Sequence, residues 1–165
     1  MAVNDQDNIL HGPCRIYVDA AQDLGFTTGG VSVRKSNDYL DVEADQVMGI
    51  IKKGRTSEKM FVSTTILEAV LANMQVAFAE PGTNTSATGM SFGTAAADTI
   101  EHTITIIGEA PAGGTRTYTF HRAVLAEDVD HIAGARDAIG SLPITFECMK
   151  DPDNNYMFGN YVDTA

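Results

Sequence analysis

Alternation of apolar and polar residues is the feature that most constrains the fold of this chain. The segment YLDVEAD shows it most clearly, because Leu40 and Val42 alternate with three acids, Asp41, Glu43 and Asp45. Side chains of a β-strand point in turn to the two faces of a sheet, so this period of two predicts a strand with one apolar face. Similar runs occur in PCRIYVD, TIEHTITIIGE, TRTYTFHRAVLAE and LPITFECMKD. The chain is therefore expected to be mainly β, in hairpins joined by short turns.

One segment follows a helical period instead, from residue 65 to residue 80. Its apolar residues recur at steps of three and four, and Thr65 with Glu68 matches the capping box that begins many helices. A Pro-Gly pair follows and would end the helix. The face that carries Glu68 and Gln75 has a single charge, which is little for a face in water. We expect an assembly to cover that face.

Together these elements predict an antiparallel β-sandwich or barrel with one flanking α-helix at residues 65–80. The length of 165 residues suits a single domain, residues 1–165. Residues 1–12 are polar and are expected to form a flexible arm. The tail at residues 154–165 is expected to form either a further edge strand or a second flexible arm.

The segment VMGIIKKGRTSEKMFV is predicted to form a hairpin with its turn at or near KKGR, where Gly54 supplies the backbone freedom that a turn needs. The segment is too apolar for an ordinary solvated loop, and its first apolar residues are Val47, Met48, Ile50 and Ile51. Two interpretations stay open. The four residues pack on a neighbouring subunit, or an alternating strand buries half of them in the subunit's own core.

The chain carries 22 acids and 11 bases, which gives a net charge of −11. Proteins that grip nucleic acid by its phosphates present clustered Lys and Arg, so this charge argues against such a role. Two distant cysteines, Cys14 and Cys148, lie in apolar alternating runs and are predicted to be buried thiols. The N-terminus lacks the pattern of a signal peptide, and no apolar stretch approaches the roughly 20 residues of a membrane span.

No motif in the sequence predicts catalysis or metal binding. The acids Asp41, Glu43 and Asp45 would share one strand face, but like charges about 7 Å apart with no nearby His are typical of a solvated surface. The segment DPDNNY starts as a calcium loop does, yet Tyr156 and Val162 stand where Gly and Glu are required. We therefore expect no enzyme activity, no metal and no cofactor.

The order of these segments over residues 12–80 resembles the major tail tube proteins of long-tailed bacteriophages and of related phage-like particles. The resemblance rests on GPCRIYVD, a turn followed by GGVSV, a strand ending in LDVEADQ, the apolar segment VMGIIKKG, and KMFVSTTILEAVLANM as strand into helix. Beyond residue 82, only the order of the strands is similar.

The resemblance implies a structural virion protein whose subunits form hexameric rings that stack into a hollow tube. Genomic DNA passes through such a tube without specific binding, and an acidic wall would repel its phosphates. The implied partners are further copies of this chain and other tail proteins, such as the terminator, the tape measure and the distal tail protein. The implied location is the virion tail, with the host cytoplasm during assembly.

Candidate residues follow from the apolar segment and this resemblance together. Subunit contacts are expected at Val47, Met48, Ile50, Ile51, Lys52, Lys53, Arg55, Glu68 and Gln75. The candidates for the lumen are Asp41, Glu43 and Asp45, whose other interpretation is the outer surface of the tube. Two alternatives stay open for the whole protein. One is another virion component of the same fold, namely a tail terminator, a decoration protein or the tube of a contractile injection machine. The other is a ligand-binding β-sandwich.

Overall fold

The fold comes from a computed structural model, which describes residues 12–44, 47–80, 86–93, 99–110, 113–126, 128–131 and 140–164. This part of the chain contains eight strands, one α-helix and one 3-10 helix. The strands are β1 Cys14–Val18, β2 Gln22–Asp23, β3 Thr27–Ala44, β4 Val47–Ile66, β5 His102–Glu109, β6 Thr115–Leu125, β7 Leu142–Met149 and β8 Gly159–Thr164. The α-helix is α1, Leu71–Ala77, and the 3-10 helix is Pro152–Asn154.

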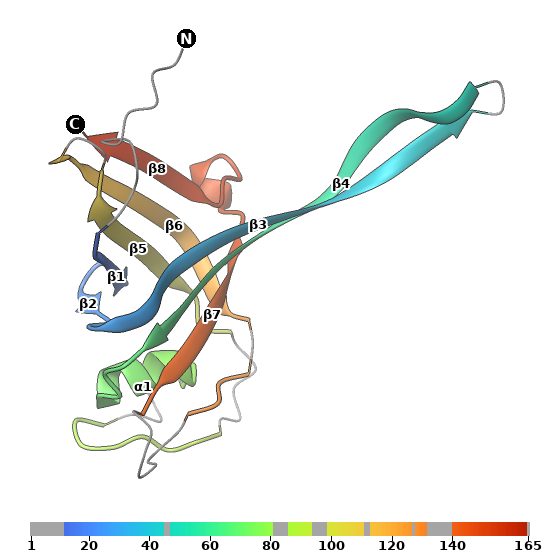
Figure 1. Ribbon diagram of the computed structural model, residues 1–165. Coiled ribbons are helices and arrows are strands. Elements are labelled where there is room, and N and C mark those ends of the chain that lie inside the picture. Colours follow the sequence, from blue (N-terminus) through green and yellow to red (C-terminus); the bar gives the residue numbers. More distant parts are fainter. Residues whose placement is uncertain are drawn as a thin grey trace.

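All eight strands belong to one antiparallel sheet with the order β2-β1-β5-β6-β7-β4-β3. β8 pairs with the first half of β6, and β7 pairs with the second half of the same strand. The sheet curls over itself but does not close into a barrel (Figure 1). The predicted class, antiparallel β with one flanking α-helix, is therefore confirmed, and the barrel is excluded as its shape.

The core lies between the two halves of the curled sheet. Ile16, Ile104 and Phe120 come from the β1, β5 and β6 half, and Val62 and Phe146 come from the β4 and β7 half. These five side chains are at most 4% exposed. Their alternation with polar neighbours along each strand is the pattern that the sequence showed, because one face of each strand points inward.

The helix begins later than its capping box predicted. Thr65 and Ile66 remain in β4, where they pair with Pro143 and Leu142 of β7 and with β3 on the other side. These β-branched residues suit a strand that is hydrogen-bonded on both sides, and this pairing outweighs the local helix signal. Val70 caps the helix without a side-chain hydrogen bond.

The apolar residues at steps of three and four, Leu67, Val70, Leu71, Met74 and Phe78, predict the buried face of the helix, but α1 buries a different set. Its buried residues are Asn73, Val76 and Ala77, while Met74 and Phe78 pack against the core only in part. The side-chain amide of Asn73 donates to the backbone oxygens of Leu24 and Glu68, at 3.1 and 2.8 Å. A buried amide whose hydrogen bonds are satisfied can hold a helix against the core, as an apolar residue does. The spacing of apolar residues therefore did not indicate Asn73.

The largest departure from the sequence prediction is the hairpin. KKGR is no turn: Gly54 lies inside β4 and pairs with Leu40, and Lys53 pairs with Asp41. The chain reverses between Ala44 and Val47, which pair with each other. The strand expected at YLDVEAD is only the outer part of an 18-residue strand, β3, and β4 is 20 residues long. A glycine without a positive φ fits a strand, so its presence alone did not identify a turn.

The two ends of the fold can be compared with their predictions as well. Of the two expectations for residues 154–165, the edge strand is present, because β8 pairs with β6 from Phe120 to Thr115. Residues 1–11 of the expected N-terminal arm lie outside the described part.

Cys148 is buried and Cys14 is half-buried, and both thiols are free. Burial raises the pKa of the Cys148 thiol to about 12.

Candidate assembly surface

The β3–β4 hairpin extends well beyond the rest of the sheet, and we call its outer part, residues 36–44 and 47–59, the arm. β7 pairs with β4 only from Met60 to Ile66, so no other described strand flanks the arm. Figure 1 shows it as a two-stranded ribbon that projects away from the body. A two-stranded ribbon alone is marginally stable in water. The arm is therefore an element that gains from a partner.

The arm exposes large apolar side chains on a ribbon that has no core of its own. Leu40 is 60% exposed and Ile51 is 54% exposed. Leu40 pairs with Gly54, so the opposite strand offers no side chain to cover it. The other exposed apolar residues of the arm are Tyr39, Val42 and Ile50. A cluster of this kind is typical of a protein contact surface.

The pairing register between β3 and β4 is irregular along the arm. The β3–β4 pairing shifts between Asp38 and Tyr39 and again on both sides of Glu43. Gly49 has a φ of 115°, a conformation that other residues adopt rarely. Bulges increase the local twist of a ribbon and disrupt its free edges. The arm is therefore poorly suited to pair edge to edge with strands of other molecules. A partner would contact it through its side chains.

A cluster of charges holds the arm where it leaves the body. The Glu58 carboxylate accepts from Lys35, from Arg55 at 3.1 Å and from Lys150 at 3.5 Å. Lys150 directly follows β7, so this cluster joins the arm to the body. The hydrogen bond from Lys35 is the main reason why the pKa of Glu58 lies below its ordinary value, and the charge of Arg55 acts in the same direction.

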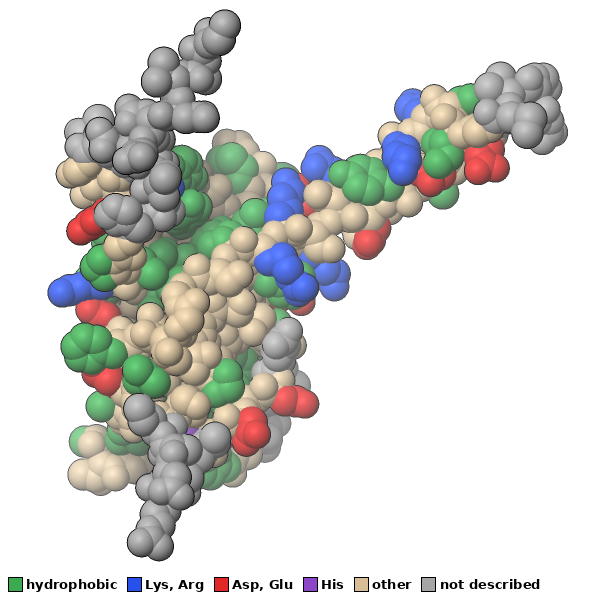
Figure 2. Space-filling view, viewed as in Figure 1, with side chains coloured by type: hydrophobic (Ala, Val, Ile, Leu, Met, Phe, Trp, Pro, Cys, Tyr) green, Lys and Arg blue, Asp and Glu red, His purple; other side chains and the backbone are tan. Residues whose placement is uncertain are grey.

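Charge is distributed unevenly between arm and body. The arm, residues 36–44 and 47–59, holds four of the 11 Lys and Arg and four of the 22 acids, a formal charge of zero. The rest of the chain therefore carries the whole net charge of −11. Figure 2 shows Lys and Arg gathered along the arm and its base. The body therefore repels other acidic surfaces, whereas the arm carries no net charge that would do so.

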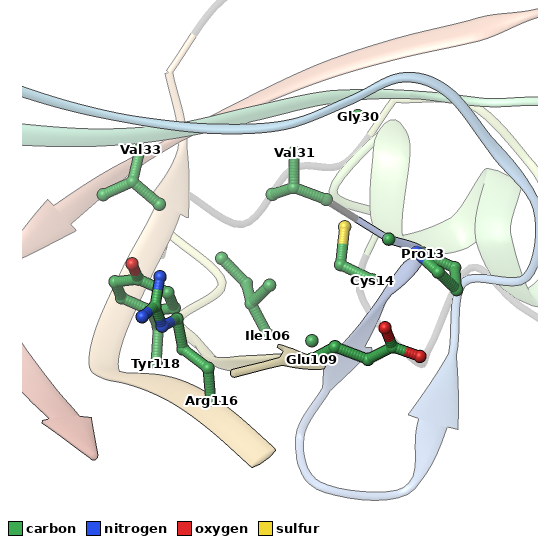
Figure 3. A pocket seen from close by; sticks show the side chains of 11 residues that line it. Pro13, Cys14, Gly30, Val31, Val33, Ile106, Glu109, Arg116 and Tyr118 are labelled. Atoms are coloured by element: carbon green, nitrogen blue, oxygen red, sulfur yellow. The ribbon is translucent and has the colours of Figure 1, made fainter. Parts of the chain in front are cut away.

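An apolar groove lies on the body near the open side of the curled sheet (Figure 3). Its volume is about 400 Å³. β3 forms one wall with Val31 and Val33, and β1, β5 and β6 form the other with Cys14, Ile106 and Tyr118. Glu109 and Arg116 stand at its rim. The groove exists because the sheet stops short of closure, and sequence patterns had not indicated it.

The structure places most of the predicted contact residues on the arm. Ile50, Ile51, Lys52, Lys53 and Arg55 all lie exposed on β4. Val47 and Met48 begin the same strand, but their side chains, like the whole of Asp45, lie outside the described part. These contact roles stay predictions, as do the lumen roles. Sequence reasoning missed Tyr39, Leu40 and Val42 as contact candidates, although the alternation in YLDVEAD was a usable signal.

The lumen candidates Asp41 and Glu43 share this arm with the contact candidates. Asp41 lies 3.4 Å from the Lys53 ammonium. Lys53 offsets part of the negative charge that Asp41 presents at the surface, and the lumen roles of Asp41 and Glu43 stay predictions.

Glu68 and Gln75 both lie outside the arm, and the two side chains have different neighbours. The Glu68 carboxylate accepts the backbone N–H of Phe26 at 3.1 Å and lies against Gly25, so it stabilises the turn before β3. Gln75 is half-buried on α1 and lines a small polar cavity of about 250 Å³ together with His102. Neither position belongs to the surface that the arm presents.

Among the described residues, no group of three or more His, Cys, Asp or Glu side chains is placed to hold a metal ion. No helix in the described ranges is both long and apolar enough to cross a membrane.

No family model and no curated protein matches the sequence. One solved structure that the chain resembles is the cryo-EM structure of the anti-feeding prophage (AFP) baseplate, 6-fold symmetrised. The match covers 90% of this chain and 90% of that chain, with 8% sequence identity and a TM-score of 0.48. Likeness at this level assigns neither a family nor a function.

Proposed function

We propose that this chain is a non-enzymatic structural subunit of a phage-type particle. Its copies would form hexameric rings that stack into a hollow tail tube through which genomic DNA passes. The single observation that carries the proposal is the arm, which exposes several large apolar side chains beyond any core of its own. A protein that works as a monomer gains nothing from such an element, whereas a subunit of an assembly buries it.

Two further features support a tube in particular. Residues 12–80 resemble tail tube proteins, and this resemblance implies an apolar contact segment at residues 47–51, which belong to the arm. The net charge of −11 suits a channel that lets DNA slide, because each phosphate contact to a cation would add affinity. The candidates for the lumen in this proposal are Asp41, Glu43 and Asp45.

Electron microscopy of the purified chain tests the proposal. Negative-stain images, with light scattering on the same sample, should show rings or tubes with an open central channel at high concentration. Irregular aggregates, or a monomer that stays monomeric when tube ends of the same kind are added as seeds, would contradict it. Measured copy number separates a tube from a terminator or a decoration protein, because only a tube polymerises without end.

A ligand-binding β-sandwich is the second candidate, and the groove is the observation that favours it. A volume of about 400 Å³ lies within the size range of small-molecule sites, roughly 300–1,000 Å³. A thermal-shift screen of the monomer against small ligands tests this candidate. Stabilisation that the groove variant Val33→Lys abolishes would support it over the tube.

A further inference from the structure

β8 is an edge strand that contributes little to the core. It runs beside β6 (Figure 1), and none of its six residues is buried. Among the described strands, β8 pairs with β6 alone. The buried core cluster contains no residue of β8. The attachment of this strand therefore depends on its backbone pairing and on a few side chains that contact β6.

One aromatic pair joins the two strands. Tyr161 of β8 and Tyr118 of β6 are direct partners in the strand register. Their ring centroids lie 4.8 Å apart, and the ring planes are inclined at 45°. This separation is near the short end of the usual range for aromatic pairs, about 4.5–7 Å. All five tyrosines of the chain lie in the described ranges, and there only this pair of tyrosines has its rings in contact.

Tyr161 also has a base beside its hydroxyl group. The hydroxyl donates to the Asp163 carboxylate at 2.9 Å. Arg116 donates to the same carboxylate at 3.0 Å and helps to keep it ionised at neutral pH. An ionised carboxylate in this position is able to accept the phenol proton. The Tyr161 side chain is 49% exposed, so a small oxidant in solution can reach its ring.

These contacts suit the one-electron oxidation of tyrosine. A phenol that loses an electron becomes a strong acid, and a carboxylate that is hydrogen-bonded to its hydroxyl takes the proton as a general base. The ring of Tyr161 is then a neutral phenoxyl radical. The Arg116 guanidinium, 5.5 Å from the centre of this ring, therefore does not face a cation. Two phenoxyl radicals whose rings are in contact couple through their ring carbons.

We propose that Tyr118 and Tyr161 form an oxidative cross-linking site, at which a one-electron oxidant such as a peroxidase-generated radical joins β6 to β8 by a dityrosine bond. Two equivalents of the oxidant take one electron from each ring, and each phenol releases one proton. One carbon–carbon bond forms between ring positions next to the oxygens. The hydrogen on each of these carbons then moves to restore the two hydroxyl groups. The product has two hydrogen atoms fewer than the starting chain.

The cross-link would fasten the edge strand covalently. It closes a loop in the unfolded chain, as a disulfide does, and should therefore raise the melting temperature of the body. The site goes beyond the proposed function. Both tyrosines belong to the body of one chain, so the reaction needs no assembly.

The test uses the full-length wild-type chain at low concentration, where coupling within a chain outcompetes coupling between chains. Photolysis of a ruthenium tris-bipyridine complex with persulfate supplies the one-electron oxidant. The expected product is a monomer that has lost the mass of two hydrogen atoms and shows the blue fluorescence of dityrosine. Peptide mapping by mass spectrometry should find Tyr118 and Tyr161 in the cross-linked peptides.

Matched variants separate ring contact from exposure. Tyr118→Phe and, separately, Tyr161→Phe keep the ring but remove the hydroxyl, and each should lower the intramolecular yield about tenfold or more, because only rings in contact have a high effective concentration. Tyr156→Phe is the control. Tyr156 is 69% exposed and therefore more accessible than Tyr161, yet its loss should leave the yield unchanged.

A further variant tests the base. Asp163→Asn keeps the size of the side chain but cannot accept the proton, and it should slow the coupling about tenfold or more. Hydrogen exchange of the β8 amides shows whether the strand stays paired in this variant. A merely structural role of Asp163 would change that exchange, whereas a role in proton transfer changes the coupling rate of a strand that is still paired.

The outcomes decide the proposal. A product that joins Tyr118 to Tyr161, that persists in Tyr156→Phe and that is lost in Tyr161→Phe supports it. A chain that stays uncoupled while N-acetyltyrosine amide couples in the same solution overturns it, as does a product that joins other tyrosines. An Asp163→Asn protein with a paired β8 and the wild-type rate overturns the role of the carboxylate. The images of rings or tubes decide the tail tube separately.

Discussion

At the scale of single residues, the body depends on a few buried polar groups as well as on its apolar core. Asn73 is 1% exposed and links three segments, because its amide donates to Leu24 and Glu68 and accepts from Gln22 at 3.2 Å. Asparagine is a poor helix former, so local propensity would not place it in the middle of a short helix. Its partners, which lie 49 and 51 residues away in two of three cases, explain its presence.

Replacing Asn73 should therefore destabilise the body. Asn73→Ala leaves the Leu24 and Glu68 carbonyl oxygens without this donor, which should cost about 1–3 kcal/mol in the free energy of unfolding. Urea unfolding followed by circular dichroism measures the change. Gln22→Ala is the control, because it removes only one of the three hydrogen bonds and should cost less. Equal losses for the two variants would contradict this account of Asn73.

The pairing of β8 with β6 should depend on pH through Asp163. Hydrogen bonds from Arg116 at 3.0 Å and from the Tyr161 hydroxyl at 2.9 Å hold the pKa of Asp163 below its ordinary value. A carboxyl with a lower pKa in the folded state stabilises it above the unfolded-state pKa, about 3.9, and this contribution is lost as pH falls through the folded-state value.

The test compares unfolding of the wild type and Asp163→Asn from about pH 6 to about pH 3, where the Asp163 contribution changes. The wild type should lose more stability than the variant over this range, so that the two curves converge at low pH. Glu58, Glu101 and Asp151 also have lowered pKa values and act in both proteins. Curves that stay parallel would show that Asp163 does not stabilise the folded chain.

At the scale of elements, local patterns found the strands but not their lengths or limits. Alternation in YLDVEAD and LPITFECMKD identified parts of β3 and β7 correctly. β7 buries one face, whereas Leu40, Val42 and their acidic neighbours in β3 are all exposed, so the pattern found the strand there but not its surroundings. The capping box at Thr65 failed because β4 is hydrogen-bonded on both sides there. Gly54 suggested a turn, yet only the register of the whole hairpin decides where a chain reverses.

The candidate assembly surface was predictable only where its residues are neighbours in the sequence. An apolar and basic run at residues 50–55 identified one strand of the arm, while the groove arises from residues of β1, β3, β5 and β6 that only the tertiary fold brings together.

β8 has a position that tolerates no side chain. A Cβ on Gly159 would overlap the Thr119 carbonyl oxygen and approach the Phe120 Cα to 2.8 Å. Gly159→Ala should therefore push β8 away from β6, at a cost of about 1–3 kcal/mol. Hydrogen exchange of the β8 amides should accelerate in this variant. Gly54→Ala is the matched control, since nothing lies within 4 Å of its Cβ position, and its exchange should match that of the wild type.

The body should keep its stability when the arm is removed. Replacing residues 38–57 by Asn-Gly joins Asn37 to Glu58, which are paired directly across the hairpin, by a two-residue turn. The buried core contains no residue of the removed segment, so the melting temperature of the monomer should change little. Calorimetry measures that temperature, and sedimentation velocity should show that assembly is lost. A body that fails to fold without the arm would refute this division.

At the scale of the whole molecule, the chain consists of a curled acidic body with an open groove and a projecting arm that carries no formal net charge. Neither part is explained by the needs of a monomer: the arm leaves apolar side chains in water, and the groove leaves an end of the core uncovered. Association of copies would bury apolar surface of both kinds, which is why we propose assembly as the protein's function.

The most direct test is a cryo-EM reconstruction of the assembled wild-type protein, in which the path of the arm can be traced. Our account predicts that residues 39–51 lie against the body of a neighbouring subunit, in a ring or tube with an open channel. An assembly in which the arm projects into solvent, or folds back on its own body, would contradict the account.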